Sequence, residues 1–161
     1  MITHAELLSL MTYDPATGVF HWREYKYPRR PDLMVGFVSD EGYLRCKIGS
    51  QTYPLHRLAW FYVHKRWPSG QIDHINRDKA DNRLSNLRVA THGQNQTNAG
   101  AHKTNRLGVR GVRKKQRGLR YEARITHEGR VIHLGHYLTI EEAAAARKAA
   151  ERLLHGEFAG P

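Results

Sequence analysis

The stretch "QIDHINRDKADNRLSNLRVATHGQNQTN", residues 71–98, decides how this chain of 161 residues is interpreted. It contains an adjacent Asp-His pair, repeated asparagines and little apolar material, which is unusual in the middle of a globular chain. The apolar–polar alternation of "QIDHI" and "NLRVAT" predicts two short strands. Thr91 and Gln94 have the spacing of a capping box, which predicts a helix that begins in "THGQNQTN". We therefore expect a strand, a loop, a second strand and a helix.

Three side chains of this unit have the chemistry of a hydrolytic site. Asp73 supplies a carboxylate oxygen and Asn95 a carbonyl oxygen, and such hard ligands suit Mg²⁺ or Mn²⁺. His74 has an ordinary pKa of about 6.5, so it is mostly neutral at pH 7 and can accept a proton from water. It should lie on the strand face opposite Asp73 unless the strand ends there. The alternative is a turn-rich loop whose side chains only bond the backbone.

The same residues resemble a known family. Asp73, His74, Asn86 and Asn95, with the flanking "DNRLSNLR" and the upstream "HRLAWFYVHKRWP", are similar to the HNH endonucleases, in the subgroup common among phage and intron homing nucleases. The resemblance covers about residues 10–98 and implies a ββα-metal fold that holds one catalytic divalent cation, Mg²⁺ or Mn²⁺. It also implies cleavage of DNA to 5′-phosphate and 3′-hydroxyl ends.

The resemblance assigns a role to each of the four residues. It makes His74 the general base, Asp73 and Asn95 the metal ligands, and Asn86 the residue that fixes the loop between the strands and so orients His74. Asn95 stands where the family's name expects a histidine, and we expect looser metal binding from a carboxamide. The remaining polar residues of interest are interpreted as structural, or as ordinary helix and loop histidines: Asn82, Asn98, His56, His64 and His92.

The residues before this unit predict short strands and turns up to about residue 55. Asp14-Pro15 and Gly18 indicate one turn, and Gly49-Ser50 indicates a two-residue hairpin. Residues 56–66 change to a helical period, and Pro68 and Gly70 are expected to end that helix.

Residues 101–130 are strongly basic. Only two glutamates, Glu122 and Glu128, oppose ten basic residues: Lys103, Arg106, Arg110, Arg113, Lys114, Lys115, Arg117, Arg120, Arg124 and Arg130. Period-two spacing places Arg120, Glu122 and Arg124 on one face of a strand, which suits a sheet laid against DNA. The alternative is a solvated basic sheet with no specific ligand.

A second resemblance covers about residues 108–158. The segments "GVRGVR", "YEARI", "GRVIHLGHY" and "TIEEAAAARKAA" are similar to the Apetala-two (ethylene-response) type of DNA-binding domain. This implies a three-stranded sheet that enters the major groove and packs on one helix. The implied DNA contacts are Arg110, Arg113, Arg120 and Arg124, to which we add the adjacent Lys114 and Lys115 of the basic run.

The helix of this second part has clear signals of its own. Thr139 and Glu142 form a capping box, and Gly156 has the position of a C-terminal capping glycine. A stripe of small and apolar residues is expected to face the sheet: Ala143, Ala146, Ala150 and Leu153. Arg147 stands where the family often has tyrosine.

The overall composition limits the partners and the compartment. A formal net charge of +11 favours a polyanionic partner. The single cysteine, Cys46, excludes an intramolecular disulfide and every zinc site that needs two thiolates. No apolar run approaches the roughly 18 residues of a membrane span. No basic segment precedes the first apolar residues, so we expect no secretory signal and no membrane partner, and an intracellular, cytoplasmic protein.

These observations predict an α+β protein in two parts. Residues 1–98 are expected to form an HNH nuclease domain with preceding β-hairpins and a ββα-metal core at about 56–98. Residues 99–108 are the expected linker, and residues 109–161 the Apetala-two-like domain, a small three-stranded antiparallel sheet on one helix. The predicted activity is metal-dependent cleavage of double-stranded DNA by a phage homing endonuclease, as a monomer or weak dimer. The alternatives are a catalytically inactive DNA-binding regulator and an RNA-binding structural protein.

Overall fold

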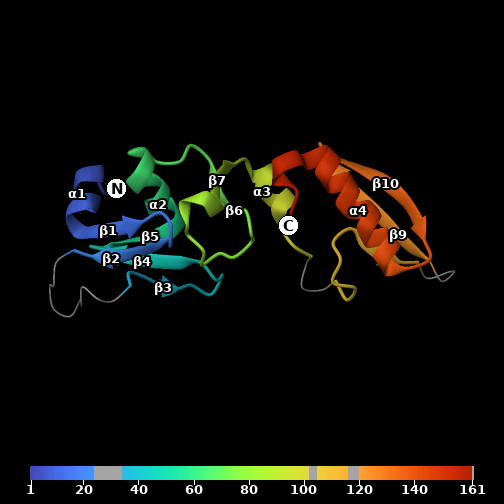
Figure 1. Ribbon diagram of the computed structural model, residues 1–161, viewed down its shortest axis with the longest axis horizontal. Helices are drawn as coiled ribbons and strands as arrows, with labels where there is room; N and C mark the ends of the chain where they lie inside the picture. The colour runs from blue at the N-terminus through green and yellow to red at the C-terminus, as the bar shows by residue number, and fades with distance from the viewer. Residues whose placement is uncertain (24–33, 102–104, 116–119, 161) are drawn as a thin grey trace. The chain divides into compact units, whose positions relative to one another are not determined.

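The computed structural model describes residues 1–23, 34–101, 105–115 and 120–160. The chain divides into two compact α+β units, the N-terminal unit Met1–Asn95 and the C-terminal unit Gln96–Pro161 (Figure 1). The prediction that a linker separates two domains at residues 99–108 stays a prediction. None of the helices in these described ranges combines the length and the apolar character needed to cross a bilayer.

The N-terminal unit consists of small antiparallel sheets and helices. Its elements are α1 (His4–Leu10), β1 (Met11–Asp14), β2 (Val19–Trp22), β3 (Phe37–Val38), β4 (Leu44–Ile48), β5 (Gln51–Pro54), α2 (Leu55–His64), β6 (Gln71–His74), η1 (Leu84–Asn86), β7 (Leu87–Ala90) and α3 (His92–Asn98), the last of which extends past Asn95. The strands form the sheets β1-β2, β3-β4-β5 and β6-β7.

The two predicted turns of this unit are present. In the first, the Asp14 carboxylate accepts hydrogen bonds from Ala16 N at 2.9 Å and from Thr17 Oγ1 at 2.8 Å. The chain then reverses at Gly18, which has a φ of +77°. In the second, Ile48 pairs with Gln51, so Gly49-Ser50 is a two-residue hairpin turn. Gly49 has a φ of +60°, as such turns require.

Two features of this unit differ from the prediction. Helix α1 lies where only strands and turns were expected; its Thr3 and Glu6 form a capping box. Helix α2 covers most of the predicted residues 56–66 but ends at His64, because Lys65 takes a left-handed conformation with a φ of 57° and terminates the helix there.

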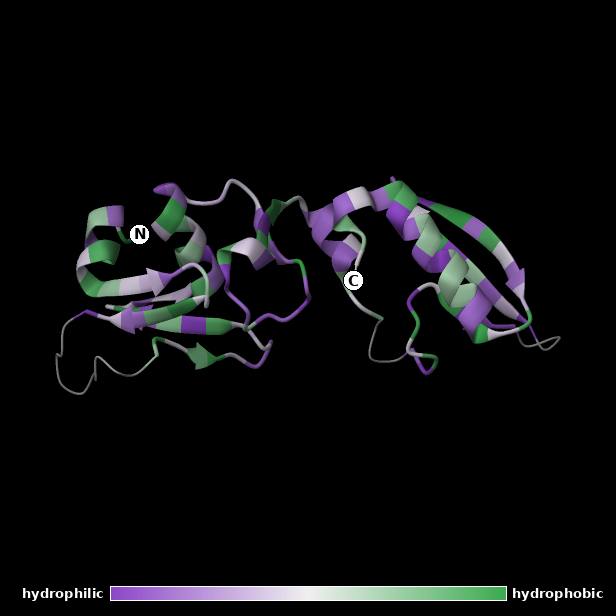
Figure 2. Ribbon diagram, viewed as in Figure 1, coloured by the Kyte–Doolittle hydropathy of each residue, from purple (hydrophilic) through white to green (hydrophobic). Residues whose placement is uncertain are grey.

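The hydrophobic core of the N-terminal unit lies between α1, α2 and the strands around them. Its fully buried members come from both ends of the unit: Leu7, Met11, Phe20, Leu55 and Leu58, with Ile72 and Leu87 contributed by β6 and β7. The β6–β7 hairpin is therefore anchored on this core through one face. The loop that joins these strands is mostly hydrophilic (Figure 2).

The predicted strand–loop–strand–helix order is present at residues 71–98. Strands β6 and β7 pair antiparallel, with Asp73 opposite Arg88 and His74 opposite Leu87. Thr91 and Gln94 form the expected capping box at the start of α3, since Gln94 N donates to Thr91 Oγ1 at 3.3 Å and Thr91 N to Gln94 Oε1 at 2.8 Å.

The C-terminal unit has a three-stranded antiparallel sheet and one long helix, as expected. Its elements are β8 (Val112–Lys114), β9 (Tyr121–His127), β10 (Arg130–Tyr137), α4 (Ile140–His155) and η2 (Gly156–Phe158), and the strand order is β10-β9-β8. Helix α4 lies over one face of the sheet (Figure 1). Its small core is formed by Val112, Ala123 and Ala143.

The face of α4 that packs on the sheet agrees with the prediction at Ala143 and differs from it at Leu153. The capping box of Thr139 and Glu142 is present, and Gly156 caps the other end. However, the buried residues of α4 are Ala143 and Arg147, whereas Leu153 is 86% exposed. Arg147 is buried because it lies against the backbone of Gly111 and pairs with Glu151 at 2.9 Å. The predicted stripe is therefore wrong at Leu153 and lacks Arg147, whereas Ala143 is buried and Ala146 and Ala150 are half-buried.

Candidate functional site

Strand β6 presents Asp73 and His74 at its end, and both are buried, with exposed fractions of 4% and 5%. Successive residues of a strand point to opposite faces, so Asp73 shares a face with Gln71, and His74 shares the other with the core residue Ile72. The two residues therefore meet different neighbours, as the sequence predicted.

Asp73 is held by the strand that pairs with β6. Its Oδ2 accepts hydrogen bonds from Arg88 Nε at 2.8 Å and forms an ion pair with Arg88 Nη2 at 2.6 Å. Arg88 lies directly opposite Asp73 in the antiparallel register. The carboxylate is thus fixed and charge-compensated inside the unit, a partner that the sequence analysis did not anticipate.

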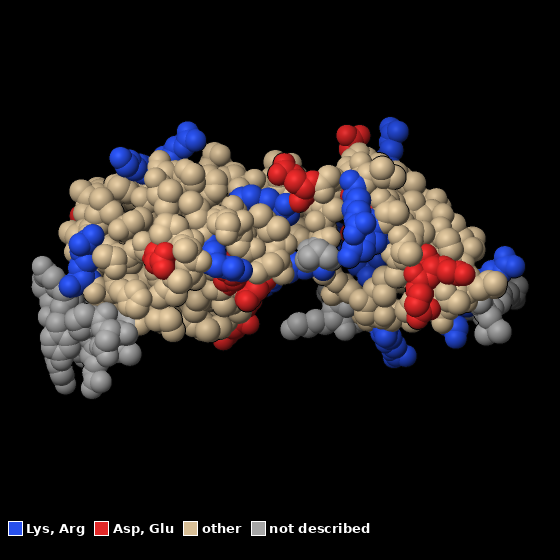
Figure 3. Space-filling model, in the orientation of Figure 1, with Lys and Arg blue, Asp and Glu red and all other residues tan. Residues whose placement is uncertain are grey.

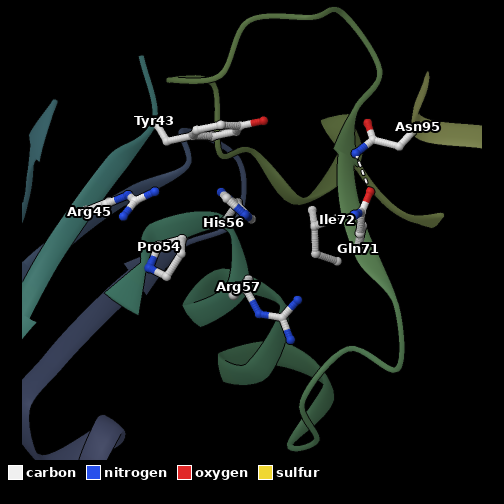
Figure 4. Close-up of a pocket in the computed structure, with 8 residues that line it drawn as sticks. All are labelled: Tyr43, Arg45, Pro54, His56, Arg57, Gln71, Ile72 and Asn95. Carbon is white, nitrogen blue, oxygen red and sulfur yellow. Dashed lines mark hydrogen bonds between the residues drawn. The ribbon is translucent and has the colours of Figure 1, made fainter. Parts of the chain in front are cut away.

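Asn95 lies in the first turns of α3, on the same side of β6 as Asp73. Its Nδ2 donates a hydrogen bond to Gln71 Oε1 at 2.8 Å, drawn as the dashed line in Figure 4. Because Gln71 and Asp73 share a strand face, this bond places Asn95 on the Asp73 side of the hairpin. Its remaining side-chain atom, the carbonyl oxygen, is the atom with metal-binding chemistry.

His74 is oriented by a residue that was interpreted as merely structural. The His74 Nε2 and Asn82 Oδ1 atoms are 3.2 Å apart, and Asn82 is only 1% exposed. Burial lowers the pKa of His74 below its ordinary value, so the ring is neutral at pH 7. Since Oδ1 only accepts, this bond puts the ring hydrogen on Nε2.

Asn82 is fixed in turn by the first hairpin of the unit. Its backbone carbonyl oxygen accepts a hydrogen bond from the Tyr13 hydroxyl at 2.7 Å. Gly18 approaches the backbone of Asn82 and Arg83 so closely that a Cβ on it would lie 2.4 Å from Arg83 N. The β1–β2 hairpin therefore helps to orient His74 through Asn82. This contact joins segments that are distant in the sequence, so no local sequence signal indicates it.

Asn86 binds across the loop between β6 and β7. Its Oδ1 accepts from Asn76 N at 2.9 Å, and its Nδ2 donates to Asn76 Oδ1 at 2.9 Å and to Asp81 O at 2.8 Å. These bonds close the two ends of the loop, which is the loop-fixing position that the resemblance assigned to it.

The other polar residues of this loop also bind it together. Asn76 Nδ2 donates to Asp81 Oδ2 at 2.7 Å, and Asp78 Oδ1 accepts from Ala80 N at 2.9 Å. The side-chain hydrogen bond from Arg83 lowers the pKa of Asp81 to about 2. The carboxamides and carboxylates that made this stretch unusual thus replace an apolar core in holding the loop.

His56 is a further member of the site that the sequence analysis placed among ordinary helix histidines. It lies on α2, is 8% exposed, and its ring centroid is 5.2 Å from that of His74. Burial lowers its pKa to about 3. A spacing signal could not have found it, because His56 and His74 are brought together only by the packing of α2 on β6.

Asp73 and Asn95 are the residues of the candidate site that could hold a hard cation. Within the residues that the structure describes, no three His, Cys, Asp or Glu side chains cluster in a way that would hold a metal. One carboxylate from Asp73 and one carbonyl oxygen from Asn95 fit Mg²⁺ or Mn²⁺, which keep water and substrate oxygens as their other ligands. They do not fit zinc, which is normally held by three or four protein ligands.

The predicted DNA-binding residues divide into two groups. Three of them have partners within the C-terminal unit. Arg110 Nη1 donates to the carbonyl oxygens of Thr97 and Ala99. Arg113 Nε binds the carboxylate of Glu122, and Lys115 Nζ lies 3.5 Å from it. Lys114, Arg120 and Arg124 are exposed. Lys103 and Arg117 of the basic run lie outside the described residues.

Glu122 offsets part of the positive charge of the basic face. It is 2% exposed, and the hydrogen bond from Arg113, with that of His133 at 2.8 Å, lowers its pKa to about 2. In the view of Figure 3, Lys and Arg side chains occur on both units, and Asp and Glu side chains lie among them.

Comparison with known proteins gives one family and two relatives. Residues 53–97 match the family described as HNH endonuclease, a segment shorter than half of the chain that includes Asp73, His74, Asn86 and Asn95. An uncharacterized HNH endonuclease of Acanthamoeba polyphaga mimivirus is 33% identical over 125 residues, which cover 71% of this chain and 64% of the relative.

A prophage-derived protein of Bacillus subtilis (strain 168), provisionally named an HNH homing endonuclease, is 32% identical over 84 residues, or 52% of this chain and 49% of the relative. The chain spans less than two thirds of either relative's length. No solved structure matches it. The family match identifies an HNH endonuclease domain, and with both relatives' names it supports an enzyme of the DNA-cleaving hydrolase class.

Proposed function

We propose that this chain is a metal-dependent HNH endonuclease that hydrolyses phosphodiester bonds of double-stranded DNA. The observation that carries the proposal is the family match over residues 53–97, which includes all four residues assigned to the site. The geometry supports it, because Asp73 and Asn95 lie on one side of β6 and a neutral His74 on the other.

Each residue has a defined part in the reaction. A divalent cation, when bound by Asp73 and Asn95, would neutralise charge on the phosphate and stabilise the leaving oxygen. His74 accepts the proton of the attacking water; because Asn82 holds Nε2, the accepting atom is Nδ1. The water oxygen bonds to phosphorus, the bond to the 3′ oxygen breaks, and that oxygen takes up a proton from solvent, which leaves a 5′-phosphate and a 3′-hydroxyl. Asn86 maintains the loop that positions these groups.

The C-terminal unit supplies DNA affinity in this proposal. Its sheet leaves Lys114, Arg120 and Arg124 exposed, and such residues bind phosphates or base edges. The resemblance to the Apetala-two type supports the use of the sheet face rather than α4 for this contact. We further propose a homing role, since one relative bears that name. The single site per chain favours nicking of one strand.

A plasmid-nicking assay tests the proposal. Wild-type protein should convert supercoiled plasmid to the open-circular form with Mg²⁺ or Mn²⁺ and not with EDTA. His74→Ala should lower the rate by about 10²- to 10⁴-fold, the usual contribution of a general base. His64→Ala is the matched control, because His64 is exposed at the end of α2. Equal nicking by wild type and His74→Ala, or none by wild type, would instead favour an inactive DNA-binding regulator.

A further inference from the structure

Helix α3 carries the proposed metal ligand Asn95 and has no apolar face to hold it in place. It consists of seven residues, His92–Asn98, and none of them has an apolar side chain. Isolated helices shorter than about 12 residues are marginal in water, and most helices in proteins are stabilised by an apolar face packed on a core. Only Asn98 of this helix is buried. The position of Asn95 therefore depends on polar contacts at the two ends of α3.

The first end of α3 is held by polar side chains. Thr91 and Gln94 form the capping box, and Asn95 Nδ2 donates to Gln71 Oε1 at 2.8 Å (Figure 4). The Gln71 Nε2 and His92 Nδ1 atoms lie 3.4 Å apart. The second end has different needs, because the last four carbonyl groups of a helix require partners from outside its regular hydrogen bonds.

Arg110 supplies such a partner at the second end. Its Nη1 donates to the carbonyl oxygen of Thr97, in the last turn of α3, and to that of Ala99 at 2.9 Å. All three residues belong to the C-terminal unit. The C-terminus of a helix carries a partial negative charge, so a cation there stabilises the helix. Helix α3 has no basic residue in its own last turn. Arg110 therefore provides the charge that the helix itself lacks.

The backbone on both sides of Arg110 is fixed. Asn105 Nδ2 donates to Val109 O at 2.6 Å, and Arg124 N donates to Gly111 O at 2.8 Å. Gly111 has a φ of +72°, and a Cβ on it would lie 2.4 Å from Arg124 O, so this turn packs directly on β9. Arg110 itself is half-buried. Its guanidinium therefore reaches the end of α3 from a turn that is held against the sheet.

We infer that Arg110 is a positioning residue for Asn95 and acts by capping the end of α3. The inference rests on the proposed endonuclease function, in which Asn95 and Asp73 hold the cation. Asn95 is the first of the last four residues of α3, so loss of the Arg110 bonds frays the turn that carries it. A residue outside the family match, which covers residues 53–97, then orders a metal ligand within that match. Arg110 has this task in place of the DNA contact that the Apetala-two resemblance implies.

Amide hydrogen exchange in the full-length protein measures the cap directly. Spectra of ¹⁵N-labelled protein in EDTA give the exchange rates for the amides of residues 95–98. Arg110→Met keeps an unbranched side chain and removes the donor, so these rates should rise about tenfold, as expected for a lost charge-assisted hydrogen bond. Arg110→Lys keeps a charged donor and should restore most of the protection. Arg106→Met is the matched control, because Arg106 is exposed in the same loop, and should leave the rates within about twofold.

The affinity for Mn²⁺ connects the cap to Asn95. Electron paramagnetic resonance of free Mn²⁺ gives the dissociation constant without cleavage. Arg110→Met should raise this constant about tenfold, the usual cost of removing a residue that orients a metal ligand, whereas Arg110→Lys and Arg106→Met should stay close to wild type. Affinity for a labelled duplex in EDTA should fall by the same small factor in Arg110→Met and Arg106→Met, because each variant loses one charge.

Unchanged exchange rates in Arg110→Met would overturn the inference, and so would faster exchange with unchanged Mn²⁺ affinity. A loss of duplex affinity specific to Arg110→Met, with α3 exchange unchanged, would make Arg110 a DNA contact instead. Plasmid nicking separates these outcomes from failure of the proposed function. A wild type that nicks, with wild-type Mn²⁺ affinity in Arg110→Met, sinks the inference alone. A wild type that neither binds Mn²⁺ nor nicks, with faster α3 exchange in Arg110→Met, sinks the endonuclease and keeps Arg110 as the cap of α3.

Discussion

Asp73 shows how far a single buried charge determines the candidate site. Its carboxylate is 4% exposed and held by Arg88, so in the absence of a metal the guanidinium is its counter-ion. A divalent cation at Asp73 and Asn95 would share that carboxylate with Arg88. In the proposed site, metal binding and the Asp73–Arg88 ion pair would therefore be coupled.

Arg88→Met should make the stability of the protein depend on metal. The change keeps most of the side-chain volume but removes the guanidinium that pairs with the buried Asp73 carboxylate, which should lower the free energy of unfolding by about 3 kcal/mol in EDTA. Mg²⁺ or Mn²⁺ should restore part of this loss, because the cation replaces the guanidinium. Thermal unfolding with and without metal measures both effects.

The control for this variant is Arg83→Met, which breaks the exposed ion pair with Asp81. It should have a smaller effect and no metal dependence. A metal-induced rise in Tm that is the same in Arg88→Met and wild type would contradict the coupling.

His56 should make the unfolding free energy depend on pH. In the unfolded chain its pKa is about 6.5, and in the folded protein burial lowers it to about 3. Below pH 6.5 the unfolded chain therefore binds a proton that the folded protein does not, and stability falls as pH falls towards 3. Between pH 7 and pH 5 this residue alone should remove about 2 kcal/mol.

Urea unfolding at pH 7, 6 and 5 in EDTA measures this dependence. His56→Gln should show a shallower loss than wild type, and His64→Gln an unchanged one. The pKa of His74 is lowered by burial in the same way, so some dependence should remain in His56→Gln. Parallel curves for His56→Gln and wild type would exclude the effect.

At the scale of elements, the β6–β7 loop depends on a turn that is distant in the sequence. Tyr13 and Gly18 of the first hairpin contact the backbone at Asn82, and Asn82 binds His74. The orientation of His74 therefore depends on how closely the β1–β2 turn approaches this loop.

Gly18→Ala should disturb the site from that turn. A Cβ would lie 2.4 Å from Arg83 N and 2.5 Å from the carbonyl carbon of Asn82, so backbone must move. A displacement of about 1 Å at a positioning residue can lower the rate roughly 10²-fold, and we expect nicking by Gly18→Ala to fall towards that value.

Gly49→Ala is the matched control. Its φ is also positive, but a Cβ there meets nothing within 4 Å. It should lower stability by about 1 kcal/mol through backbone strain alone and leave the nicking rate unchanged. Equal nicking rates for the two variants would mean that the turn does not position Asn82.

Elements with local signals were predictable from the sequence. The capping boxes at Thr91 and Thr139 and the Gly49-Ser50 turn depend on residues within four positions of each other, and all three are present. Helix α1 carries the same kind of local signal in its Thr3 and Glu6 capping box. Helix α2 ends where Lys65 takes a left-handed backbone conformation, which glycine would have indicated in the sequence and lysine does not.

Contacts between distant segments were beyond the reach of sequence patterns. The adjacency of Asp73 and His74 and the position of Asn95 on a helix could be read directly. The partners of Asp73 and His74 could not be read from the sequence. Arg88 reaches Asp73 only when β7 pairs with β6, and Asn82 and His56 reach His74 only when the loop and α2 pack against it. The same limit applies to the basic run, where alternation placed Glu122 on the arginine face but not in contact with Arg113.

At the scale of the whole molecule, the net charge of +11 does not translate directly into DNA affinity. Much of it comes from the C-terminal unit, where some arginines already have partners. The exposed Arg120 and Arg124 should therefore each contribute more to salt-dependent DNA binding than an arginine that already has a partner within the unit.

A double substitution measures that contribution. Arg120→Gln with Arg124→Gln should reduce the slope of log affinity against log salt by up to about 1.8, because each lost phosphate contact removes about 0.9. Lys148→Gln with Arg152→Gln removes the same charge from exposed positions of α4 and should leave the slope nearly unchanged. If both double variants reduced the slope equally, DNA would not bind the sheet face in preference to α4. Fluorescence anisotropy of a labelled duplex at several salt concentrations provides the slopes.

The buried Glu122 gives the proposed DNA-reading sheet an internal anion of its own. Arg113, Lys115 and His133 are grouped around that carboxylate, so a DNA phosphate that binds at Arg113 Nε would displace it. Such an exchange replaces one bound anion by another and releases few salt ions at these two positions. Binding through Arg113 and Lys115 would then vary little with ionic strength, and the sheet would favour a rigid, well-fitted duplex over loose polyanions such as heparin.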